Sequence, residues 1–167
     1  KDYEVMRILI DAKADLDART ELRREFVSFS RGNPQGGRLT GIADHTLDSD
    51  GSRPGLRWIN KGGLTPLLFA ARDGDLDAAK LLAAAGANLN ATTGIGETAL
   101  MLAAHNDHTE VALFLLDQGA DPNVAEAGHT ALHFAVARKN IDLVKALIAH
   151  KADVGGAPIG AINQAVD

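Results

Sequence analysis

Two runs of the chain approach known phosphate- and ion-binding patterns. The run 32–40 is glycine-rich like a phosphate-binding loop, but Arg38 replaces the required lysine and no strand is predicted before it. The run 48–51 (Asp-Ser-Asp-Gly) is similar to part of a calcium loop, but Thr46 and Arg57 occupy its first and last ligand positions. We expect neither run to bind a nucleotide or an ion.

The histidines offer the next candidates for chemistry. His105 and His108 are three residues apart at a helix–helix junction, and a metal site there would need further ligands. His129 and His133 are four apart, but no acid follows at the spacing of a metalloprotease helix. There is no cysteine, and no nucleophile is paired with a base. We therefore predict no catalytic residue, no metal ligand and no cofactor.

The composition favours a single folded domain. The 167 residues are 46% hydrophobic but only 4% aromatic, so the core must consist of Ala, Leu, Ile and Val. No run approaches about 18 apolar residues, which predicts no membrane span. The net charge of −5 disfavours nucleic acid as a main partner. The first residues do not read as a signal peptide.

Two motifs recur at a spacing near 33 residues. The segment 63–67 (Gly-Leu-Thr-Pro-Leu) returns as similar segments at 96–100 and 128–132. A second motif, Gly-Ala-Asn or a variant of it, stands at 13–15, 86–88, 119–121 and 151–153. Its first two copies are 73 residues apart, which is one period plus 40 residues. One insert of that length therefore interrupts the array.

Each period is expected to form two short helices. Thr65 is placed to cap a first helix, and Pro66 takes its first position, where the missing N–H costs little. Gly74 suits a left-handed turn, after which a second helix spans 76–84. The same pattern predicts helices at 2–10, 98–104, 109–117, 130–138 and 141–150.

Stacked neighbours must bury the apolar faces, because a single unit cannot do so alone. Each large core side chain contributes roughly 1.5–3 kcal/mol. The predicted core consists of Leu67, Leu81, Leu82, Leu100, Leu115, Leu116, Leu132, Leu147 and Ile148.

These motifs resemble the ankyrin repeat family, whose pattern is Gly-x-Thr-Pro-Leu-His-x-Ala-Ala, a Val- and Leu-rich helix, and Gly-Ala-Asp-Val-Asn. Leu68 and Met101 replace the family histidine, which His133 keeps. The resemblance covers nearly everything outside the insert. It implies an all-α, ankyrin-type helical repeat solenoid with one long insert in an inter-repeat finger.

The resemblance also has local implications. Asp107 and Lys139 stand where the family prefers glycine between its helices, so we expect left-handed backbone there at some cost. His108 stands where the family often has a histidine that hydrogen-bonds the backbone of the next repeat.

The chain 1–167 is divided into one domain of consecutive units. The helix expected at 2–10 matches only the second helix of a repeat unit, with no first helix before it. The segment Gly160–Val166 is similar to the first helix of a further unit. We therefore expect either a fragment of a longer array or a longer protein whose ends are not represented in this sequence. The units are 1–20 (partial repeat), 21–60 (insert), 61–92, 93–124 and 125–156 (repeats), and 157–167 (partial repeat).

The concave face of ankyrin-like stacks is the usual partner surface of the family. The position after the family histidine is occupied by Phe69, Leu102 and Phe134. These three side chains form either a row along the groove, here called the apolar ladder, or ordinary core. Neighbouring polar candidates are Arg72, Asp73, His105, Asn106 and Arg138, and the finger candidates are Lys61, Ile95, Glu97, Glu126 and His129.

The insert differs in composition, with several glycines, arginines and aromatic residues. The spacing of Leu22, Phe26 and Phe29 predicts a short helix from about Glu21 to Ser30. The insert either carries partner specificity, through Trp58 and its arginines, or folds back over the apolar ladder.

The sequence predicts a protein–protein interaction module that binds through its concave face and fingers, without catalysis. The partner is a protein or peptide of unknown identity, or another part of a longer parent chain; nucleic acid and membrane are not expected. The alternative is a scaffold segment of a larger multi-domain enzyme or effector, with the chemistry outside this chain. A third hypothesis is an enzyme site within the insert. Nothing in the sequence specifies a compartment.

Overall fold

The computed structural model describes residues 3–29, 55–125 and 128–154. The runs 32–40 and 48–51, Glu126 and the helix expected at 160–166 lie outside these residues. The described elements are α1 (Glu4–Asp11), β1 (Arg23–Phe29), β2 (Gly55–Lys61), α2 (Pro66–Asp73), α3 (Leu76–Ala84), α4 (Ala99–His105), α5 (Thr109–Asp117), α6 (Ala131–Ala137) and α7 (Ile141–Ala149).

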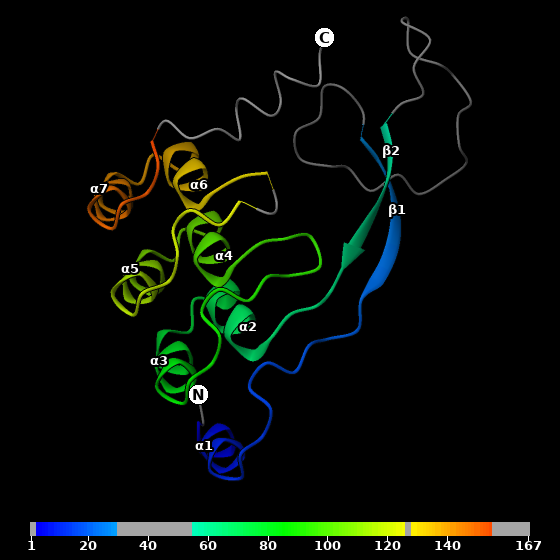
Figure 1. Cartoon of the computed structure of the whole chain (residues 1–167). Helices are drawn as coiled ribbons and strands as arrows, with labels where there is room; N and C mark the ends of the chain where they lie inside the picture. The colour runs from blue at the N-terminus through cyan, green and yellow to red at the C-terminus, as the bar shows by residue number, and fades with distance from the viewer. Residues whose placement is uncertain (1–2, 30–54, 126–127, 155–167) are drawn as a thin grey trace, which may run out of the picture.

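The helices form a two-layered stack, with α2, α4 and α6 in one row and α1, α3, α5 and α7 in the other (Figure 1). Within the first row α4 packs against both α2 and α6, and within the second α5 packs against α3 and α7. Each first-row helix also packs on the helix that follows it. The prediction of a helical repeat solenoid is confirmed. None of the described helices is long and apolar enough to cross a membrane.

Local capping explains where the first-row helices begin. The Thr65 hydroxyl accepts the backbone N–H of Leu68 at 3.4 Å, and the Thr98 hydroxyl accepts that of Met101 at 3.2 Å. Before α6, the backbone N–H of Thr130 donates to Nδ1 of His133 at 3.2 Å. Each contact satisfies a polar group that the first turn of a helix would leave unpaired.

The turns between paired helices are left-handed, as the sequence indicated. Gly74 has φ of 71°, and Asp107 and Lys139 adopt 62° and 57°. The expectation of left-handed backbone at the two non-glycine positions is confirmed.

The core is built mainly of leucine and alanine. Six of the nine predicted leucine and isoleucine positions are almost fully buried: Leu67, Leu82, Leu100, Leu115, Leu116 and Leu147. Leu81 and Leu132 are half-buried. The prediction for Ile148 was wrong, because this side chain is 51% exposed. It occupies the repeat position of Leu116, which lies in α5 beside α7, whereas no described helix lies beyond α7.

Polar contacts in the loops join successive units. The backbone N–H of Asp121 donates to the side chain of Asn90 at 2.9 Å, and that of Asp153 donates to Asn123 at 2.8 Å. The same geometry recurs between Asn88 and Asp17 at 3.2 Å. Repeated side chains thus link the loops as well as the helices.

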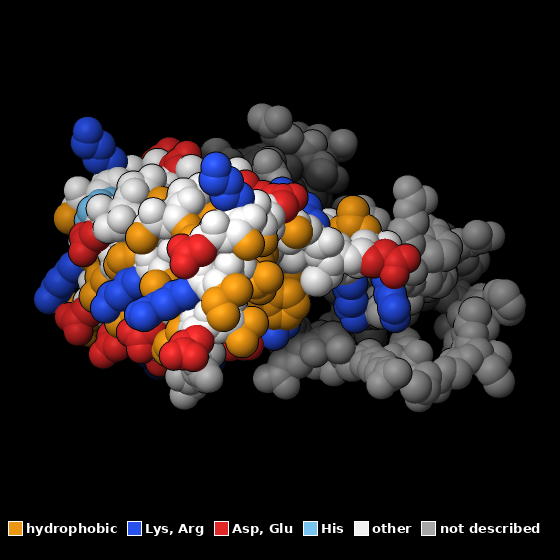
Figure 2. All heavy atoms as spheres, turned by 90° about the horizontal axis from the view of Figure 1, so that it is seen from below, with side chains coloured by type: hydrophobic (Ala, Val, Ile, Leu, Met, Phe, Trp, Pro, Cys, Tyr) orange, Lys and Arg blue, Asp and Glu red, His pale blue; other side chains and the backbone are white. Residues whose placement is uncertain are grey.

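The α1 end of the stack presents apolar side chains among charged ones (Figure 2). Val5, Ile8 and Leu9 are 63%, 64% and 52% exposed. Leu9 occupies the repeat position of Leu82, which is buried against α2. This part of α1 is exposed because no described helix takes the place that α2 takes beside α3.

The insert contains a two-stranded antiparallel sheet instead of the predicted helix. β1 pairs with β2 from Arg23 opposite Lys61 to Phe29 opposite Gly55, on the finger side of the stack (Figure 1). The helix expected from about Glu21 to Ser30 was therefore wrong. A short isolated helix is costly to nucleate, whereas residues 55–61 provide a backbone partner for this Phe- and Val-containing segment. The all-α description holds for the repeats and not for the insert.

Candidate partner-binding surface

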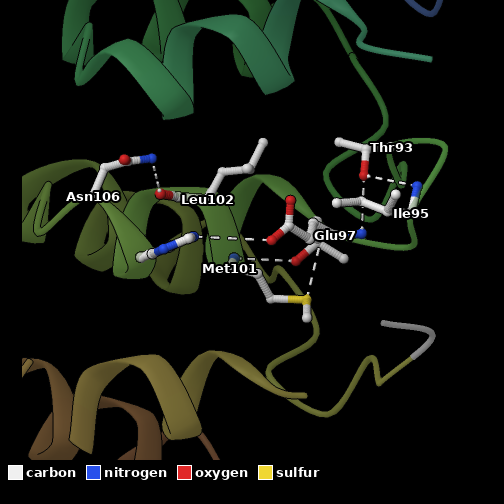
Figure 3. A network of polar contacts seen from close by, with 8 residues as sticks. Thr93, Ile95, Glu97, Met101, Leu102 and Asn106 are labelled. Carbon is white, nitrogen blue, oxygen red and sulfur yellow. Dashed lines mark hydrogen bonds and ion pairs between the residues drawn. The ribbon is translucent and has the colours of Figure 1, made fainter. Parts of the chain in front are cut away.

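The finger between α3 and α4 is a tight turn held by Thr93. Its hydroxyl accepts the backbone N–H groups of Ile95 at 3.4 Å and Glu97 at 3.1 Å (Figure 3). The Thr93 N–H donates to the Glu97 carbonyl at 2.8 Å, and the N–H of Gly94 donates to the carbonyl of Gly62 in the preceding finger at 2.9 Å. These bonds fix Glu97 immediately before the cap of α4.

The three ladder positions differ in depth. Leu102 is buried, with 6% of its surface exposed, and belongs to the core. Phe69 and Phe134 are half-buried, and Phe134 packs against the core at its edge. The apolar ladder therefore has a gap at its centre, and only its two aromatic positions offer surface.

Phe69 lies under an arginine of its own helix. The Arg72 guanidinium carbon is 4.7 Å from the centroid of the Phe69 ring. Arg72 Nε also donates to Asp73 Oδ1 at 2.8 Å, and about half of each charged side chain is exposed. A cation over a ring face is attracted to the electrons of the ring, so Arg72 and Phe69 hold each other in place.

Phe134 lies against two histidines. The His105 ring from α4 stacks on it, with centroids 4.8 Å apart and an interplanar angle of 14°. The His129 ring meets it edge-on at 5.9 Å and lies 6.1 Å from the His133 ring. This cluster joins two adjacent repeats on the same side as the fingers.

Glu97 completes the cluster. Its carboxylate Oε1 is 3.9 Å from His105 Nδ1, and 16% of its side chain is exposed (Figure 3). Burial raises the pKa of Glu97, and the positive charges that His105 and His129 can carry oppose that rise. A half-buried carboxylate thus lies beside an aromatic platform without a strong ionic partner.

The remaining candidates lie outside this cluster. Arg138 is the exposed C-cap residue that follows α6. Trp58 lies in β2, opposite Phe26 in the register. The structure therefore brings together Glu97, His105, His129 and Phe134 at one point.

His108 has a different role from these residues. Its Nε2 is 3.0 Å from the carbonyl oxygen of Arg72. The expected backbone contact exists, but it reaches the preceding repeat and not the next one. His108 joins α5 to the end of α2 because its ring points back along the stack. Within the described residues, no group of three or more His, Asp or Glu side chains is arranged to hold a metal ion.

The stack between His105 and Phe134 has only a weak signal in the sequence. Phe134 occupies the repeat position of Leu102, which is one helical turn before His105. That spacing places positions 105 and 134 on the same face of neighbouring helices. It does not reveal whether the two rings face each other.

Comparison with known proteins agrees with the fold. A family model described as ankyrin repeats (3 copies) matches residues 46–126 and 67–157. The chain is 43% identical over 68 residues to the putative ankyrin repeat protein L92 of Acanthamoeba polyphaga mimivirus, which covers 40% of this chain and 16% of that protein. It is 41% identical over 96 residues to the probable E3 ubiquitin-protein ligase XBOS33 of Oryza sativa subsp. japonica, covering 56% and 18%. The match to the putative ankyrin repeat protein FPV031 of fowlpox virus is 39% over 97 residues, covering 56% and 28%. The chain thus spans less than a third of the length of each of these relatives.

Proposed function

Because the chain belongs to the ankyrin repeat family, we propose that it binds a protein partner along the face formed by α2, α4, α6 and their fingers, without catalysing a reaction. Ankyrin repeats are generally protein–protein interaction modules, and the family is generally non-catalytic. For this chain we propose which face binds the partner, which residues contribute to it, and that the chain has no catalytic activity.

One observation carries this proposal. The described first-row helices bury most of their leucines and alanines against neighbours, yet Phe69, Arg72, His105 and Phe134 in the same row stay at least partly accessible. Aromatic and arginine side chains are the types that most often dominate binding energy at protein interfaces. Partner contacts would also involve Glu97, His129, Arg138 and Trp58, while Leu102 supports the face from beneath.

The test begins with random peptides displayed on phage and selected on the purified chain. We expect the selected peptides to lose binding when Arg72→Glu is introduced. Since Arg72 is exposed, this change leaves the core packing intact, and a loss of binding can be assigned to the surface. Lys145→Glu on α7 is the matched control, since it makes the same charge change on an exposed side chain of the other row. Equal affinities for the two variants would contradict the proposed face.

The aromatic positions provide a second variant. Phe69→Ser combined with Phe134→Ser is expected to abolish peptide binding while the circular dichroism of the helices persists. Loss of helicity would identify these side chains as core. Deletion of residues 21–60 tests whether the insert contributes to binding. If binding survives the deletion, recognition depends on the repeats and not on the insert.

The second candidate function is a scaffold segment of a larger enzyme or effector. The observation that favours it is the match to a relative named as a probable E3 ubiquitin-protein ligase, of which the chain covers 18%. In that case the chain would position a substrate for chemistry performed elsewhere. Transplanting the chain between two unrelated proteins would distinguish these functions, because an independent binding module keeps its partner in either setting.

A further inference from the structure

The carboxylate of Glu97 is incompletely paired in the described part of the chain. No described donor hydrogen-bonds it, and His105 Nδ1, at 3.9 Å, forms an ionic pair only when the imidazole carries a proton. The charged and titratable groups that act on Glu97 are His105 from α4 and His129 from the finger before α6. Arg72 in α2 is paired with Asp73 of its own helix.

A flat aromatic platform lies beside this carboxylate. One face of the His105 ring is stacked on Phe134, and about half of the His105 side chain is exposed. A guanidinium group is planar, stacks on such rings and pairs with carboxylates through fixed, parallel donors. Glu97 and His105 therefore present both features that an arginine side chain recognises.

The preceding repeat contains a filled arrangement of the same kind. There the Arg72 guanidinium lies over Phe69 at 4.7 Å, and its Nε donates to the Asp73 carboxylate at 2.8 Å. Ring, carboxylate and guanidinium all come from one helix. Around Phe134 the rings and the carboxylate are present, but no described arginine or lysine of the chain pairs with Glu97.

We propose that Glu97, His105 and Phe134 bind an arginine side chain of the partner, with its guanidinium on the imidazole and its donors on the carboxylate. This proposal rests on the proposed function and specifies the chemistry of the partner. The net charge of −5 supports it, since it favours approach of a basic segment.

The experiment compares two selections from the same displayed peptide library, one on the unchanged chain and one on Glu97→Gln. We expect arginine to be enriched at one fixed position in the first selection and not in the second. Glu110→Gln on α5 is the matched control, since it makes the same change at an exposed site in the other row and should keep the enrichment. Selected peptides without arginine would overturn this proposal but leave the proposed function intact. If no selected peptide binds this face, both fail.

A double-mutant cycle then tests the contact directly. Replacement of the peptide arginine by citrulline keeps its shape and removes its charge, and should weaken binding roughly 10-fold or more, as expected for loss of a hydrogen bond between charged groups. Glu97→Gln should weaken binding of the arginine peptide to a similar degree and have little further effect on the citrulline peptide. Fully additive losses would show that the arginine binds elsewhere. A lysine peptide that binds as tightly as the arginine peptide would refute stacking on His105.

Discussion

The stacking of repeats can be tested at one repeat position that has opposite environments in two units. Ala104 in α4 is 1% exposed, because α4 lies between α2 and α6. Val136, which occupies the same position in α6, is 59% exposed. If packing between neighbours determines stability, exchange of alanine and valine must be costly at position 104 and nearly neutral at position 136.

We expect Ala104→Val to lower the free energy of unfolding by about 1–3 kcal/mol, because two additional carbon atoms have no space between the flanking helices. Val136→Ala should stay within about 0.5 kcal/mol of the unchanged chain, since an exposed helical valine contributes little and alanine favours the helix.

Urea denaturation followed by circular dichroism measures both effects. The midpoint should fall for Ala104→Val with an unchanged slope and hardly move for Val136→Ala. Similar losses at both positions, or a neutral Ala104→Val, would refute the packing argument. A changed slope would indicate that repeats unfold separately, and the midpoint would then no longer measure one transition.

Three further predictions concern single side chains. Glu97→Gln should raise the melting temperature at neutral pH. Burial raises the pKa of Glu97, so ionisation of this carboxyl destabilises the fold as pH rises through that pKa. In acid, where the carboxyl is protonated, the gain in melting temperature should vanish. The hydrogen bond from the Tyr3 hydroxyl to Asp75 Oδ1, 2.7 Å long, raises the pKa of Tyr3 to about 12, and Asp75→Asn should lower it in a phenolate absorbance titration of this single tyrosine. That contact stabilises the fold below the unfolded pKa of Tyr3, and its contribution is lost as pH rises through about 12. Lys139→Gly should stabilise the chain by about 1 kcal/mol in urea denaturation, because Lys139 has φ of 57° and glycine adopts this conformation without steric cost.

Most of the repeat architecture could be predicted because its signals are local. Thr65 and Pro66 define the start of α2 through contacts within one turn. The second helix was expected at 76–84 and is α3, with the same bounds. The left-handed turn at Asp107 also follows from one position in the repeat.

The hairpin in the insert could not be predicted in this way. Phe26 lies opposite Trp58, and a strand needs a distant segment of the chain to satisfy its backbone. The spacing of Leu22, Phe26 and Phe29 also fits a helix, and nothing local decides between the two. Ile148 illustrates the same limit, because its repeat position is buried only where another helix follows.

The cluster around Glu97 depends both on contacts that are local in the sequence and on contacts between different repeats. Capping and the Thr93 turn place Glu97 locally, whereas the stack of His105 on Phe134 depends on how two repeats pack. A half-buried carboxylate that lacks a strong ionic partner lowers stability at neutral pH. Glutamine at position 97 should therefore give a more stable fold that binds an arginine peptide more weakly. Since a damaged fold would lose both stability and binding, opposite changes in the same variant would identify Glu97 as a residue of the binding surface.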